Sequence, residues 1–217
     1  MKKYSTIIFD LDGTLLDTLL DITDAVNETF KCLNMDYFID TEITRHFIGS
    51  GARILVDRIF NYLSIDEKLK ESYYSNYLNI YSKHVNVKTE PYPNVIETLQ
   101  KLKEKGYILG VISNKPNRDV STCLNKYFKD IFDFYTGQVG NILPKPHADI
   151  FYYLKEKFPF IKENILFVGD MLVDIEFSKN IHADCAIYEN GYGKIKSCKE
   201  ANFLFEKYMD LLKVLED

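Results

Sequence analysis

Cysteine, histidine and tryptophan are scarce in this chain of 217 residues, which has four cysteines, four histidines and no tryptophan. The cysteines lack the paired spacing of a zinc site, and the histidines form no metal-binding cluster. Asp10 interrupts the first apolar run too early for a signal-peptide core. We therefore expect reduced thiols and a cytoplasmic protein. The cysteines are Cys32, Cys123, Cys185 and Cys198.

An excess of positive charge and long hydrophobic runs are also lacking. The formal net charge is −5 and no basic stripe is visible, which argues against a nucleic-acid partner. No segment approaches the roughly 20 apolar residues of a transmembrane helix, so we expect no membrane partner. A length of 217 residues with 46% hydrophobic residues suits one sizeable core, or a core domain with a small companion.

Residues 7–17 are the most informative part of the chain. A short apolar run, predicted to be a buried strand, ends on Asp10 and Asp12, and the two-residue period of a strand points both carboxylates toward one place. Gly13 permits a tight turn there. Carboxylates this close repel each other unless a cation lies between them, and Mg²⁺ is the usual cation where phosphate is handled. Taken alone, the same residues can be a polar turn after a strand.

From residue 107 onward, predicted strands and helices alternate. Alternating strands and helices predict βαβ units and a parallel sheet with helices on both faces. We therefore expect an α/β, Rossmann-like core of three layers. The predicted strands cover 107–112, 132–136, 164–168 and 185–188, and the predicted helices begin at Pro116 and cover 147–158, 171–180 and 204–215.

The stretch from about residue 18 to 88 is different, because its apolar residues recur at helical spacing only. About seventy residues is far longer than an ordinary connection, so we expect an inserted helical subdomain. The predicted core domain comprises 1–16 and 91–217, and the helical domain comprises 17–90. Apolar helix faces are expected at Ile22, Val26 and Phe30, at Ile54, Leu55, Arg58 and Ile59, and at Tyr73, Tyr74, Tyr77, Leu78 and Tyr81.

Three further motifs follow predicted strands or loops. Ser113 ends a strand before a helix, where backbone N–H groups and the helix dipole favour a phosphate, although Ser-Asn can also be only a cap. Lys145 lies between two prolines, and its charge can neutralise a phosphoryl group, although a lone lysine usually lies on the surface. Asp170 ends a third strand, and Asp174 follows one helical turn later.

In this order the four motifs resemble those of the haloacid dehalogenase-like hydrolases, and the helical insert resembles their subclass with a helical cap. The resemblance implies a phosphoric monoester hydrolase in which Asp10 is the nucleophile and a metal ligand. It implies that Asp12 is the general acid and base, with its backbone carbonyl on the metal. Ser113 and Lys145 would hold the phosphoryl oxygens, Asp170 would bind Mg²⁺, and Asp174 would act behind the metal by orienting a water or Lys145.

Within this family the chain looks like the phosphoglycolate phosphatases, on residues 47–58, 92–95, 113–116 and 191–193. The resemblance implies a small phosphate ester as the partner, with phosphoglycolate as the expected one. Glycines at 49 and 51 can bring backbone N–H groups close to a small carboxylate, or can simply begin a helix. The substrate-binding residues that we expect are Thr14, Ser113, Asn114, Lys145, Gly49, Ser50 and Gly51.

The chain departs from the family pattern at several positions. His147 and Ala148 stand where a second proline often occurs after Lys145, and Met171 stands where serine often follows the aspartate. The segment 180–184 lacks the usual small residue and glycine. None of these changes removes a catalytic carboxylate, but Met171 can alter the polarity of the site.

Other interpretations stay open at this point. Pyrophosphatases and sugar-phosphate phosphatases of the same subclass have similar sequences. A phosphomutase is less favoured, because the histidine-containing signature of such enzymes after the first motif is missing from residues 16–26. A non-catalytic scaffold is disfavoured by the complete set of motif residues. A monomer and a homodimer are both compatible with the sequence.

Overall fold

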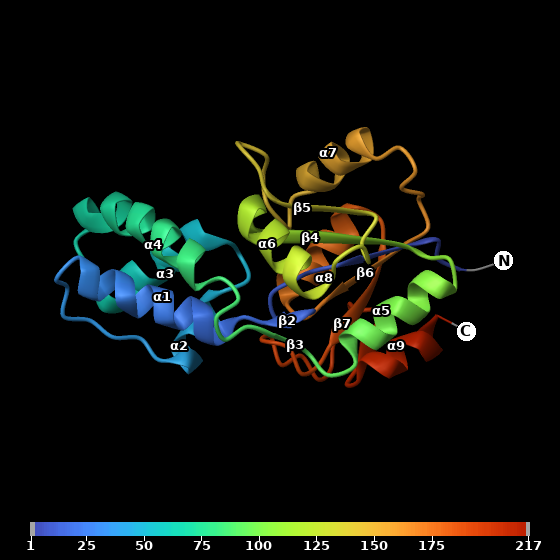
Figure 1. Ribbon diagram of the computed structural model, residues 1–217, viewed down its shortest axis with the longest axis horizontal. Helices are drawn as coiled ribbons and strands as arrows, with labels where there is room; N and C mark the ends of the chain where they lie inside the picture. The colour runs from blue at the N-terminus through green and yellow to red at the C-terminus, as the bar shows by residue number, and fades with distance from the viewer. Residues whose placement is uncertain (1–2, 216–217) are drawn as a thin grey trace.

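The computed structural model describes residues 3–215, and its main element is a six-stranded sheet (Figure 1). The strand order is β5-β4-β1-β6-β7-β8, and every neighbouring pair is parallel. The predicted α/β class is therefore confirmed. The strands are β1 (Thr6–Phe9), β4 (Ile108–Pro116), β5 (Phe134–Gln138), β6 (Ile165–Gly169), β7 (Asp184–Tyr188) and β8 (Phe203–Phe205).

Helices cover both faces of this sheet, as the alternation of side chains on β1 shows. Ile7 and Phe9 join a buried cluster with α5, α6 and α9, whereas Ile8 joins a second cluster with α7 and α8. The core thus has the three layers expected from the sequence. The helices are α5 (Val95–Glu104), α6 (Asn117–Tyr127), α7 (Asp149–Lys157), α8 (Leu172–Asn180) and α9 (Tyr208–Val214).

The remaining helices gather at one side of the sheet (Figure 1) and enclose a core of their own. Tyr73 is fully buried there, and its ring contacts those of Phe30 and Phe60 at centroid distances of 4.9 and 5.4 Å. Tyr77 and Tyr81 are buried as well, as their spacing predicts. These helices are α1 (Leu19–Cys32), α2 (Thr41–Phe47), α3 (Ala52–Leu63), α4 (Lys70–His84) and the short 3₁₀ helix η1 (Glu67–Leu69).

Several expectations on local structure are corrected. Ile54, expected on a buried helix face, is 39% exposed, because the buried face of α3 runs through Leu55 and Ile59 and Ile54 lies about 100° around the helix from Leu55. Pro116 does not begin a helix but ends β4 and caps α6. Leu204, expected at the start of the last helix, lies in β8, and α9 begins only at Tyr208. No pattern predicted the short antiparallel pair β2 (Leu16–Asp17) and β3 (Glu90–Pro91).

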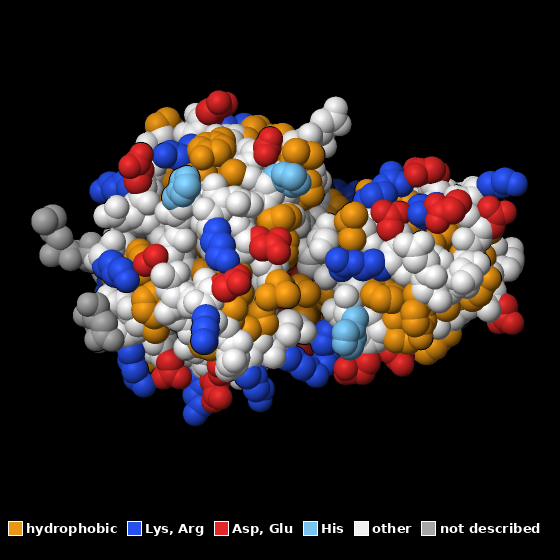
Figure 2. All heavy atoms as spheres, turned by 180° about the vertical axis from the view of Figure 1, so that it is seen from behind, with side chains coloured by type: hydrophobic (Ala, Val, Ile, Leu, Met, Phe, Trp, Pro, Cys, Tyr) orange, Lys and Arg blue, Asp and Glu red, His pale blue; other side chains and the backbone are white. Residues whose placement is uncertain are grey.

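The surface carries no dominant charge on the face drawn in Figure 2, where acidic and basic side chains are intermixed. Within residues 3–215, no helix is both long enough and apolar enough to cross a membrane.

Asp21 fixes the segment through which the chain returns from the helices to the sheet. Its buried carboxylate accepts hydrogen bonds from the backbone N–H groups of Val87, Lys88 and Thr89 at 2.8–3.1 Å. The Thr89 hydroxyl donates a fourth bond at 2.6 Å. The N–H groups of this connection lie outside any helix or sheet ladder. The Asp21 carboxylate accepts their hydrogen bonds in place of the backbone carbonyl groups that a helix or sheet would supply.

Asp21→Ala should therefore lower the free energy of unfolding by about 2–4 kcal/mol, because it removes the acceptor of two buried donors of Thr89 and of two partly buried N–H groups. Asp24→Ala is a matched control, since Asp24 lies on the same helix and pairs with the exposed ammonium of Lys88 at 2.6 Å. A surface pair of this kind is worth about 0–1 kcal/mol. Urea unfolding measures both variants, and equal effects would contradict the role given to Asp21.

Candidate active site

The candidate site lies at the carboxyl ends of three neighbouring strands, β4, β1 and β6. Asp10 directly follows β1, Asp170 directly follows β6, and Ser113 lies near the end of β4. Lys145 reaches the same place from the loop after β5. Ligands of open parallel sheets bind at this edge, so the topology brings together residues that are up to 160 positions apart (170 − 10).

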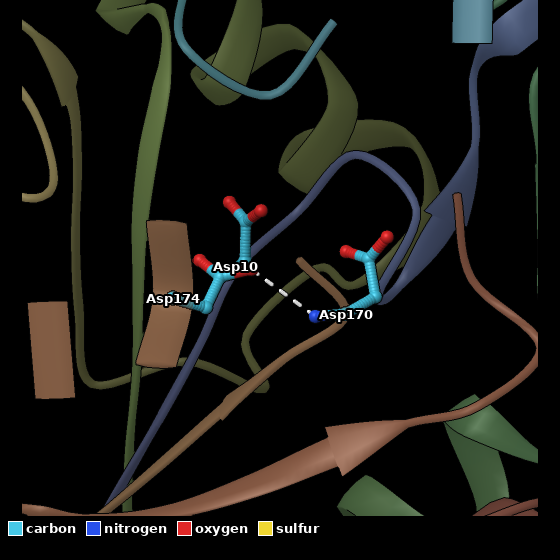
Figure 3. A group of neighbouring side chains, drawn as sticks. All are labelled: Asp10, Asp170 and Asp174. Carbon is cyan, nitrogen blue, oxygen red and sulfur yellow. Dashed lines mark hydrogen bonds between the residues drawn. The ribbon is translucent and has the colours of Figure 1, made fainter. Parts of the chain in front are cut away.

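Three buried carboxylates meet there (Figure 3). Asp10, Asp170 and Asp174 each offer one oxygen within a group whose members all lie within 4.8 Å of one another. Asp170 accepts hydrogen bonds from the Thr14 hydroxyl at 2.8 Å and from the Tyr192 backbone N–H at 2.7 Å. These bonds fix the orientation of Asp170 and still leave each oxygen a lone pair for a cation.

Asp174 differs from the other two, because its carboxylate accepts three hydrogen bonds, whereas that of Asp170 accepts two. One Asp174 oxygen accepts from the backbone N–H groups of Asp170 and Met171 at 3.1 and 3.0 Å, the first of which is the dashed line in Figure 3. The other accepts from the Lys145 ammonium at 2.7 Å. Asp174 is thus arranged to position the chain around Asp170 and the Lys145 side chain.

The Lys145 ammonium lies between two carboxylates, 2.9 Å from Asp10 and 2.7 Å from Asp174. Burial lowers the pKa of Lys145, but the attraction of Asp10 and Asp174 outweighs it and holds the pKa above its usual range. Lys145 therefore stays charged at any physiological pH.

One buried lysine does not balance this much negative charge. Burial raises the pKa of Asp10 to about 7, with Asp174 and Asp12 adding to the rise and Lys145 opposing it. Burial, Asp174 and Asp10 likewise raise the pKa of Asp170 well above its usual range. A group of buried carboxylates that resists ionisation is chemically suited to a hard divalent cation with oxygen ligands, so the residues fit such an ion.

Asn114 holds two backbone segments in place beside the lysine. Its amide nitrogen donates to the carbonyl oxygens of Lys145 and Gly49 at 3.0 and 3.1 Å, and its amide oxygen accepts from the Lys145 N–H at 2.8 Å. One buried side chain thereby connects the sheet to the loop before α3. Neighbouring Ser113 is also buried, and its hydroxyl accepts from the Lys115 N–H at 3.2 Å.

A cavity of about 50 Å³, measured as the space open to the centre of a water molecule, adjoins Asp10. Gly49 and Gly51 line it, as expected for residues near a substrate, but Ser50 does not. Ser50 instead lines a separate cavity of about 700 Å³, and its hydroxyl accepts from Arg58 at 3.2 Å. A side chain at Gly49 would meet Met171, since an added Cβ would lie 2.3 Å from the Met171 sulfur.

Two residues of the site had no predicted role. The Lys115 ammonium lies 2.7 Å from an Asp12 oxygen and also donates to the Tyr81 hydroxyl, and Asp12 accepts from the Thr18 hydroxyl at 2.8 Å. The signal for Lys115 was in the sequence, because it follows Ser113 by two residues in an extended segment and so points the same way. Tyr192 had no such signal.

Tyr192 connects Asp170 to the entry of the helical insert. While its backbone N–H donates to Asp170, its phenol oxygen accepts from the Thr18 N–H at 2.5 Å and donates to Asp17 at 3.0 Å. Long-range contacts of this kind leave no periodic pattern in the sequence.

Comparison with known proteins agrees with this geometry. The family model described as haloacid dehalogenase-like hydrolase matches residues 7–188. A phosphoglycolate phosphatase of Mannheimia succiniciproducens is 33% identical over 225 residues, which cover 99% of each chain. A phosphoglycolate phosphatase of Haemophilus influenzae strain Rd is 34% identical over 234 residues, covering 98% of this chain and 99% of the relative.

A solved structure is also similar to this chain over its whole length. The crystal structure of a predicted phosphoglycolate phosphatase from Haemophilus somnus superposes with a TM-score of 0.89 at 30% identity, and 99% of each chain is covered. The family and enzyme class expected from the sequence, a phosphoric monoester hydrolase, are thereby confirmed, and this chain belongs to the haloacid dehalogenase-like hydrolases.

Proposed function

We propose that the protein is a Mg²⁺-dependent phosphatase that hydrolyses a small phosphomonoester through an aspartyl-phosphate, with phosphoglycolate as its substrate. The observation that carries the proposal is the position of Asp10. This residue lines the cavity, and its carboxylate lies 2.9 Å from the buried Lys145 ammonium. A carboxylate beside a fixed cation can attack an incoming phosphoryl group whose charge the cation offsets.

The proposed metal ligands are the carboxylates of Asp10 and Asp170 and the backbone carbonyl of Asp12. Asp174 supports them from behind through Lys145 and the N–H of Asp170. When bound, Mg²⁺ supplies positive charge that draws the phosphate toward the carboxylates and spreads the negative charge of the transition state.

In the first step, an oxygen of Asp10 forms a bond to phosphorus while the bond from phosphorus to the leaving alkoxide breaks. Ser113 and Lys145 hold the phosphoryl oxygens, and Asp12, as the general acid, transfers a proton to the alkoxide. In the second step, Asp12 takes a proton from water, the water oxygen bonds to phosphorus, and the bond to Asp10 breaks. Two displacements at phosphorus replace one difficult attack by water.

Phosphoglycolate is the proposed substrate for two reasons. The relatives with about one-third identity are phosphoglycolate phosphatases, and the cavity beside Asp10 is small. Gly49 and Gly51 line that cavity, so their backbone N–H groups are suited to a carboxylate. Pyrophosphate and sugar phosphates are the alternative substrates.

The proposal also includes a motion of the helical domain. This domain closes over the site about residues 16–18 and 91–93 and so excludes water during the reaction.

Phosphate release from phosphoglycolate, pyrophosphate, sugar phosphates and an aryl phosphate tests the proposal. With Mg²⁺ the wild type should prefer phosphoglycolate, and EDTA should abolish turnover. Asp10→Asn should lower kcat by at least about 10⁴-fold, because an amide cannot form the phosphoenzyme. Activity retained by Asp10→Asn would overturn the proposed nucleophile, whereas sugar isomerisation without phosphate release would identify a phosphomutase.

Asp10→Asn should also stabilise the metal-free protein at neutral pH. The folded chain keeps the Asp10 proton up to about pH 7, whereas an unfolded carboxyl loses it near about pH 4. The free energy of unfolding therefore falls as the pH rises between these values, and the cost stays in full above pH 7. In EDTA at pH 7.5 the variant should melt several degrees higher, at about 2–4 °C per kcal/mol, and the gain should shrink toward pH 5.

Asp12→Asn is the control for this melting experiment. It leaves the buried Lys115 ammonium without its carboxylate partner, so it should lower Tm. Saturating Mg²⁺ should raise the Tm of the wild type more than that of Asp10→Asn. An Asp10→Asn variant that melts at or below the wild-type temperature in EDTA would contradict the unbalanced charge of the site.

A further inference from the structure

The cavity beside Asp10 is lined by two aspartates and by a single cation. Apart from Asp10 and Asp12, its described lining residues are neutral or apolar, with Lys115 as the exception. Lys145 does not line this cavity, and its ammonium lies between Asp10 and Asp174. Any second negative group on a substrate that occupies this cavity therefore has one side chain available to neutralise it.

Lys115 is held where the sheet meets the helical insert. Its side chain is nearly fully buried and its ammonium lies 2.7 Å from Asp12, on the sheet side. From the other side, Tyr81 of α4 accepts a hydrogen bond from the ammonium, and the Tyr81 ring centroid is 4.8 Å away. Within residues 3–215 these contacts use two of the three N–H donors of the ammonium, so the third can serve a ligand.

We propose that Lys115 is the residue that selects phosphate esters whose leaving group carries a carboxylate. The inference rests on the proposed function and deepens it, because it assigns substrate choice to one ammonium group at the meeting point of α4 and β4. Tyr81 positions that ammonium, so the selecting group is complete only when the helical insert lies against the sheet.

The physical reason is the cost of burying charge. A carboxylate that enters a cavity already lined by Asp10 and Asp12 loses its hydration and meets two groups of the same sign. A charge-assisted hydrogen bond from Lys115 offsets that loss, whereas a neutral leaving group neither needs nor gains it. The backbone N–H groups near Gly49 and Gly51 carry only partial charge, so they cannot replace the ammonium.

The test compares phosphoglycolate with its uncharged carboxamide analogue, which has almost the same size. The readout is the ratio of kcat/KM for the acid to kcat/KM for the amide. In the wild type the acid should be preferred, and Lys115→Met should lower this ratio about 10- to 100-fold, mainly through KM, because one charged hydrogen bond is lost. Lys115→Arg should restore part of the preference, and Tyr81→Phe should lower it by a smaller factor.

Loss of activity on both esters by the same factor would overturn the inference, because it would mean that Lys115 acts only on Asp12. A wild type that does not distinguish acid from amide would overturn it as well. If Lys115→Met does not fold, Lys115→Arg and Tyr81→Phe decide the same question.

A binding measurement separates this inference from the proposed function. Titration calorimetry in an Asp10→Asn background measures the affinity of both esters without turnover. Tighter binding of the acid that disappears with Lys115→Met would support Lys115 even if the wild type released no phosphate, in which case only the proposed function would fail. Equal affinities for acid and amide, with or without Lys115, would overturn the inference alone.

Discussion

The buried ion group of Lys145, Asp10 and Asp174 is the interaction on which the rest of the site depends. A single ammonium lies within 3 Å of both carboxylates, and all three groups are withdrawn from water. Removing the Lys145 ammonium would leave two buried carboxylates without a counter-charge, which is far more costly than the pairing is favourable. The group therefore constrains which neighbouring structures can form.

Those constraints can be followed outward. The Asn114 amide hydrogen-bonds both the carbonyl oxygen and the N–H of Lys145, and it also donates to the carbonyl oxygen of Gly49. The position of the Lys145 ammonium therefore depends on the position of the helical insert. Asp174 holds the N–H of Asp170, which fixes the turn after β6. Charge, backbone and insert are thus parts of one network, in which each member is satisfied only in the observed arrangement.

Much of this arrangement follows from the sequence, for a simple reason. Alternating strands and helices fix a parallel sheet, and the carboxyl ends of parallel strands share one edge, so Asp10, Ser113 and Asp170 had to come together. Lys115 was equally predictable from its two-residue spacing to Ser113. By contrast, Ile54 was misplaced because helical spacing alone does not say where a buried face ends.

Other features depend on contacts that no local pattern records. The β2–β3 pair is two residues long on each side, too short for periodicity, and Tyr192 meets Thr18 across more than 170 positions. Asn114 was expected to bind substrate, and its amide instead has backbone partners in Lys145 and Gly49, so its contact with substrate stays a prediction. The proposed choice of substrate depends on the single ammonium of Lys115, whose partners Asp12 and Tyr81 lie far from it in the sequence.

The most direct test of the account is to look for the phosphoryl group on Asp10. Acid quenching of the enzyme during turnover of phosphoglycolate, followed by mass spectrometry of its peptides, should find the added phosphoryl mass on the peptide that contains Asp10. Asp12→Asn should increase its amount, because the water that hydrolyses the phosphoenzyme then lacks its base. A turning-over enzyme without phosphorylated Asp10, or with the phosphoryl group on another residue, would contradict the account.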